Sequence, residues 1–194
     1  PISEYEFSNN DEYIAALRKQ IEDIKTKNAA EEQKLKDSIP EWYGMASMPK
    51  NTDTIMYAKG THTSADLDQS ELIGLEKAKA KLASNLASIM SLKIEIATNE
   101  KVIDVDSAFK SEITSISKSV AKEVSIGGYK VYKSATVELS NGKFRNFIII
   151  EFPVTVAYKA FLDNVKSNPA TKNNIKKIAD TEAFKELEQL VTGA

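Results

Sequence analysis

The sequence contains no cysteine, which excludes disulfide bonds, thiolate zinc sites and cysteine nucleophiles. Arginine is almost missing as well. Arg18 and Arg145 are the only two, so the forked guanidinium groups that read bases and clamp phosphates are scarce. The formal net charge of -2 gives no strong field toward nucleic acid or an anionic membrane. We therefore expect no nucleic-acid partner.

Long apolar runs and histidine are also scarce. No apolar run approaches the roughly 20 residues that span a bilayer, and the first residues, PISEYEFSNNDEYI, lack the pattern of a signal peptide. His62 is the only histidine. A hydrolytic or metal site would have to combine His62 with Asp66 and Asp68, but this spacing matches no zinc or calcium loop. We expect no catalytic residue, metal or cofactor, and hence no enzyme.

Residues 11–39 have the pattern of an N-terminal amphipathic helix. Its apolar positions follow the 3-4-3 spacing of a coiled coil, and we call them the N-terminal seam: Ile14, Leu17, Ile21 and Ile24. The seam breaks at Asn28 and Glu31. Two heptads are too few for a stable isolated coiled coil. We expect the segment to dock either on its own domain or on neighbouring subunits.

Proline at position 40 ends that helix, and residues 40–53 form a connector. Residues 54–61 have strand propensity. A helix then begins near Asp66, a predicted cap, with this apolar stripe: Leu72, Leu75, Leu82, Leu86 and Ile89. The apolar period changes to two over Leu92, Ile94 and Ile96, which predicts a half-buried strand.

The second half of the chain predicts a helix, a hairpin and further helices. The helix begins near Ser107, with Asp106 as its cap, and stops at Gly127-Gly128. Asn141-Gly142 between two strand-like runs predicts a β-hairpin with a type I′ turn. Residues 147–150 are apolar on both faces, which indicates a central strand, and Pro153 marks an edge, a bulge or the strand's end. A short helix near Tyr158, the polar linker KSNPATKNN and a final helix, DTEAFKELEQLV, follow.

These elements predict an α+β fold, with helices packed on a small, mostly antiparallel sheet. The chain divides into an N-terminal helical segment, residues 1–39, and an α+β domain, residues 40–194. Trp42 and Tyr43, beside two methionines, either close the edge of the core or form an aromatic contact between subunits.

The connector and the elements after it carry a resemblance to a known family. PEWY (40–43), a strand that closes on glycine in IMYAKGT (55–61), and the alanine-spaced EKAKAKLASNL (76–86) together resemble the lipoprotein-20 family of bacterial envelope proteins. The resemblance covers about residues 40–192. It implies structural roles for Pro40, Trp42 and Gly60, with no catalytic or cofactor residue.

The same resemblance implies a structural subunit of the cell envelope, because some family members are outer-membrane lipoproteins that form rings or disks around the flagellum. We expect a homo-oligomer, with the N-terminal seam, Trp42 and Tyr43 in its contacts. The family's lipid-bearing cysteine is missing, so an outer-membrane or periplasmic location requires processing from a lipoprotein precursor. The alternatives are a cytoplasmic or virion component of another large assembly, or a module that binds a small ligand or peptide.

Overall fold

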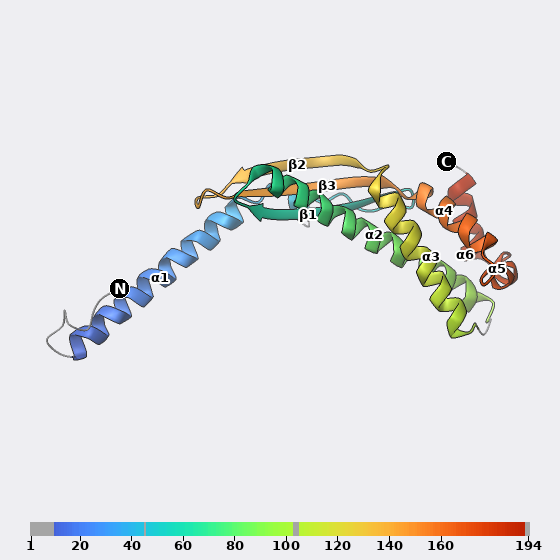
Figure 1. The fold of residues 1–194 in the computed structure, drawn as a ribbon, viewed down its shortest axis with the longest axis horizontal. Coiled ribbons are helices and arrows are strands. Elements are labelled where there is room, and N and C mark those ends of the chain that lie inside the picture. The colour runs from blue at the N-terminus through green and yellow to red at the C-terminus, as the bar shows by residue number, and fades with distance from the viewer. Residues whose placement is uncertain (1–9, 45, 103–104, 193–194) are drawn as a thin grey trace.

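The computed structural model describes residues 10–44, 46–102 and 105–192. Figure 1 shows an elongated molecule in which α1 extends from one end, the sheet and α2 form the middle, and the helices after α2 gather at the other end. In chain order the elements are α1 (Asn10–Asp37), η2 (Glu41–Tyr43), β1 (Ile55–Ser64), α2 (Leu67–Glu100), α3 (Ser107–Ile126), β2 (Lys130–Glu138), β3 (Phe144–Pro153), α4 (Val154–Ser167), α5 (Lys172–Ile178) and α6 (Glu182–Thr192).

The sheet has the strand order β1-β3-β2, and both pairings are antiparallel, which confirms the predicted α+β class. Gly60 of β1 lies opposite Ile148 of β3, and Ala135 of β2 lies opposite Phe147. The central position of β3 confirms the prediction from its two apolar faces, since residues 147–150 are all buried. The strand ends at Pro153, one of the predicted alternatives.

The hairpin between β2 and β3 is confirmed, but its predicted type I′ turn is wrong. Within the described chain Gly142 has a positive φ of 71°, whereas Asn141 has not. The Gly142 N–H donates to the Leu139 carbonyl oxygen at 2.9 Å, and the Leu139 N–H donates to that of Lys143 at 2.7 Å. This pattern is a type I turn followed by one left-handed residue, and glycine supplies that residue without steric cost.

Both edge strands carry a local interruption. The register of β2 shifts between Val131 and Lys133, so that Tyr132 is the additional residue of a β-bulge. On β1, the N–H of Tyr57 points away from β3 and donates to the Asn51 side-chain oxygen at 2.8 Å. The connector therefore occupies the outer edge of β1 near its start.

Helix α2 is the longest element and links the sheet to the other helices. From its first turn its buried residues recur at every fourth position: Ser70, Gly74, Ala78, Leu82, Leu86, Met90 and Ile94. Four residues exceed one helical turn by about 40°, so this buried line winds around the helix. The first part of α2 consequently faces β1 and β3, and the later part faces α3 and α6.

The predicted strand over Leu92, Ile94 and Ile96 is wrong, because α2 continues without a break to Glu100. Leu92 and Ile96 are 50% and 41% exposed, while Ile94 is buried. The winding of the buried line brings Ile94 to the core and leaves its two apolar neighbours at the surface. Leu72, predicted on the buried stripe, is 60% exposed for the same reason.

Helix α2 approaches β1 most closely at Gly60. A Cβ on Gly60 would collide with the Gly74 carbonyl oxygen and would lie 2.6 Å from the Ala78 backbone nitrogen. A Cβ on Gly74 would in turn collide with the side-chain oxygen of Asn146 on β3. Backbone therefore packs directly on backbone here, which only glycine allows.

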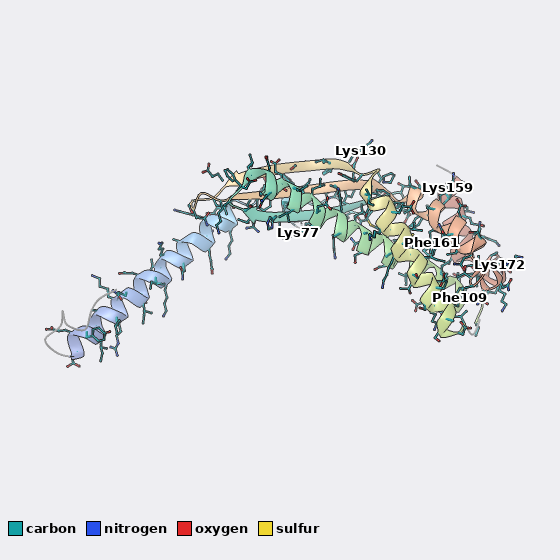
Figure 2. The ribbon with its side chains drawn as sticks, in the orientation of Figure 1. Lys77, Phe109, Lys130, Lys159, Phe161 and Lys172 are labelled. Carbon is teal, nitrogen blue, oxygen red and sulfur yellow. The ribbon has the colours of Figure 1, made fainter. Side chains whose placement is uncertain are left out.

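The helices at the far end share one apolar core with α2. Their fully buried aromatic and aliphatic side chains include Tyr158, Phe161, Ile178, Phe184 and Leu187. Figure 2 labels Phe109 of α3 and Phe161 of α4, which belong to this core. The segment predicted as a polar linker is only partly a linker: α5 begins at Lys172 and buries Ile175 and Ile178.

The close approach at Gly60 gives a first prediction. Gly60→Ala should lower the free energy of unfolding by about 3 kcal/mol, because the added methyl group meets backbone atoms that cannot move aside. Chemical denaturation measures the change. Gly127→Ala is the matched control, since Gly127 is extended and a Cβ there meets nothing within 4 Å. Equal effects of the two substitutions would contradict this account.

The continuity of α2 gives a second prediction. Ile94→Ala should cost about 2–5 kcal/mol of unfolding free energy, because it leaves a cavity in the core. Leu92→Ala, two residues away, should cost less than about 1 kcal/mol, because half of that side chain is already in solvent. A strand would place both residues on one face and give comparable losses, so similar denaturation midpoints would argue against the continuous helix.

Candidate functional site

The N-terminal seam lies on α1, and most of it is open to solvent. Ile14, Ile21 and Ile24 are 44%, 53% and 58% exposed, and Leu17 is half-buried. None of the other described elements packs extensively against α1. Figures 1 and 2 show this helix projecting from the sheet end, with side chains around it and no neighbouring element along most of its length. The described part of the chain thus leaves most of this apolar face uncovered.

The end of α1 nearest the sheet has a different surface. Asn28, Glu32, Lys34 and Ser38 line an open hollow of about 480 Å³ together with the hairpin loop, residues 138–141. Asn28 continues the heptad spacing of the seam, so the hollow beside the hairpin loop reaches the seam line at this residue. Most of these lining side chains are polar or charged, and the hollow is open to solvent.

Trp42 and Tyr43 lie on η2, against the sheet face opposite α2. Gly60 and Ile148 face α2, so Phe147 points to the other face. The Tyr43 ring packs edge-on against Phe147, with centroids 5.0 Å apart, and Trp42 packs edge-on against Tyr43 at 6.0 Å. Packing on the sheet therefore accounts for the position of Tyr43. The predicted contact of both residues with another subunit stays a prediction.

An aromatic pair that the sequence analysis missed lies on the same face of the sheet. The rings of Tyr57 on β1 and Tyr132 on β2 pack edge-on at 5.3 Å, and the Lys133 ammonium lies 5.7 Å from the Tyr132 centroid. The bulge puts Tyr132 on this face, although simple alternation along β2 assigns it to the other. No pattern in the sequence marks the bulge.

The residues of the hypothetical hydrolytic or metal site do not form one. Nδ1 of His62 lies 3.2 Å from the Lys77 ammonium, so a lysine neighbours the imidazole. The Asp66 carboxylate instead accepts the Gln69 N–H at 2.8 Å, the predicted cap of α2. Among the described residues, no group of three or more histidine, aspartate or glutamate side chains is arranged to hold a metal ion.

Hollows between α2 and α3 bear on the alternative of a ligand-binding module. One of these has a volume of about 190 Å³ and is lined in part by Ile94, Phe109 and Ile113. Ligand pockets usually measure about 300–1,000 Å³. Its neighbour, of about 490 Å³, is a shallow surface between alanine and serine side chains, which include Ala83, Ser84 and Ala87. Neither hollow has the depth of a small-molecule site.

The perturbed pKa values have structural causes. Burial raises the pKa of Tyr158, and the negative charge of Asp53 adds to this effect. Burial also raises the pKa of Tyr43, against the opposing influence of Arg145. A hydrogen bond from Lys101, 2.6 Å long, lowers the pKa of the Asp180 carboxyl group. These causes are packing and one surface ion pair, so they do not mark a site of proton transfer.

In comparisons with known proteins, no family model, curated protein or solved structure matches the chain. Within residues 10–192, apart from the three positions not described, no helix has the length and apolarity to cross a membrane. We take the exposed N-terminal seam of α1 as the candidate functional site, because it is an aligned apolar surface open to solvent.

The contact between Tyr43 and Phe147 gives a third prediction. Tyr43→Ala should lower the free energy of unfolding by about 2 kcal/mol, because it uncovers the Phe147 side of the sheet. Tyr43→Phe keeps the ring and should change this free energy by less than about 0.5 kcal/mol. Chemical denaturation and sedimentation should be measured on both variants. An unchanged stability of Tyr43→Ala with smaller assemblies would instead assign Tyr43 to a contact between copies.

Proposed function

We propose that this protein is a non-enzymatic structural subunit that self-associates through the N-terminal seam. One observation carries the proposal: three isoleucines on one face of α1 are between 44% and 58% exposed, on a helix that projects from the rest of the chain. Exposed apolar groups aligned at coiled-coil spacing are typical of a surface that another helix covers.

The resemblance to lipoprotein-20 proteins supplies the biological setting of the proposal. We place the assembly in the bacterial envelope, as a ring or disk associated with the flagellum. The motifs themselves support this setting, and so does Gly60, whose close contact with α2 agrees with a structural role for that motif position. The seam argument is independent of this setting and holds equally for another large assembly.

The energetics favour many weak contacts over one tight pair. Full burial of a leucine or isoleucine side chain contributes roughly 1.5–3 kcal/mol, and only the exposed part of each seam residue remains to be covered. Association itself costs roughly 4–15 kcal/mol in lost freedom of motion. Two isolated copies should therefore bind weakly. A closed assembly, in which each copy is held at more than one place, gains from a high effective concentration.

The seam gives a fourth prediction. The double substitution Ile21→Glu and Ile24→Glu should abolish self-association of the full chain, because it places charged carboxylates on the face to be buried. Sedimentation velocity over a range of protein concentrations measures the change. The thermal unfolding of the sheet and of α2 should be unaffected, since α1 stands apart from their core.

Thr26→Glu with Ala30→Glu provides the matched control. Helical spacing puts these two positions on the side of α1 opposite the seam, and the substitutions add the same charge. This variant should self-associate like the unmodified chain. A chain that is monomeric at every concentration, or control and seam variants that behave alike, would rule out the proposal.

A further inference from the structure

We propose that the α1 helices of two copies pair antiparallel, with Ile14 of each chain beside Ile24 of the other and Leu17 beside Ile21. This inference rests on the proposed function, because it names the partner of the N-terminal seam as a second copy and sets its direction. The pair has a two-fold axis near residue 19.

The extent of the seam favours this direction. Antiparallel pairing aligns four apolar layers and leaves the polar residue Asn28 beyond the overlap, next to the point where the partner's helix begins at Asn10. Parallel pairing would place Asn28 beside its own counterpart. A pair of asparagines at this heptad position costs stability in a parallel coiled coil.

The hairpin loop adds a steric argument. Asn28, a heptad position of the seam, shares a hollow with the hairpin loop, residues 138–141, as do Glu32, Lys34 and Ser38. A parallel partner helix would have to continue through this space to its own Asp37. Antiparallel pairing instead puts Asn10, the first residue of the partner's α1, opposite Asn28. The antiparallel overlap of the two α1 helices thus reaches only the edge of this hollow.

The charges beside the seam agree with the antiparallel direction. It brings Asp11 of each chain close to Lys25 of the other, which gives two ion pairs, one at each end of the overlap. The two Arg18 side chains meet near the axis and repel each other. In the parallel direction the attractive pair is Lys27 with Glu32, which lies beyond the last apolar layer. In the antiparallel pair the ion pairs thus lie directly beside the apolar layers.

The direction also separates the two α+β domains. From the axis near residue 19 to Asp37 is about 18 residues, or about 27 Å of helix. The two domains would therefore join the paired helices about 54 Å apart, at opposite ends. Neither domain restricts the other, so each keeps its remaining surface for further contacts in an assembly.

Disulfide trapping tests the direction, and the absence of cysteine makes every introduced thiol unique. A mixture of the full-chain variants Ile14→Cys and Ile24→Cys should form a disulfide-linked dimer under mild oxidation. Ile14→Cys alone should not, because the two copies of residue 14 are about 10 residues, or about 15 Å, apart along the helices. Thr26→Cys, on the opposite face, is the control for random collision.

The other outcomes separate this inference from the proposed function. Efficient cross-linking of Ile14→Cys alone would show parallel pairing, which overturns the direction while self-association through the seam stands. No cross-linking in any seam variant, with assemblies still present by sedimentation, would overturn the pairing of α1 and place the contact elsewhere. No cross-linking and a monomer at every concentration would overturn both the direction and the proposed function.

Discussion

The contact between backbone atoms at Gly60, Gly74 and Ala78 is the constraint on which the rest of the structure depends. It holds the first half of α2 so close to the sheet that no side chain fits between the two backbones. The axis of α2 is thereby set by β1, and everything that packs on the later half of α2 takes its position from that axis. A small sheet of three strands can organise the chain in this way because the helix crossing it is long and unbroken.

The winding line of buried residues on α2 explains how one helix packs both on the sheet and on the other helices. A helix that packed on a single flat partner would bury one straight stripe. Here the spacing of four residues, from Ser70 to Ile94, turns the buried side gradually from the sheet toward α3 and α6. The sheet and the helical end therefore share a continuous core and are not two domains joined by a linker.

Sequence patterns predicted those parts of the fold that local chemistry determines. The helical caps at Asp66 and Asp106, the hairpin, the ends of α3 and the central place of β3 all follow from a few adjacent residues. Prediction from the sequence failed where contacts between residues far apart in the chain determine the structure. Leu92, Ile94 and Ile96 alternate like a strand, but the winding of α2 puts only Ile94 in the core.

The same division applies to the candidate site. The spacing of the seam was visible in the sequence, because heptad positions are a local pattern. Its exposure was not, since nothing local says whether a sheet or another helix lies beside α1. Tyr57 and Tyr132 were missed because their contact depends on a bulge, and the packing of Tyr43 on Phe147 depends on a connector that crosses the sheet.

The interruptions in the two outer strands limit how readily a second molecule could extend this sheet. A long, regular strand at a sheet margin invites the same strand of another molecule to add to it, and such growth has no natural end. The extra residue at Tyr132 disturbs that template on β2, and Asn51 already occupies a donor of β1. Sheets of neighbouring molecules are thus discouraged from joining edge to edge into fibres.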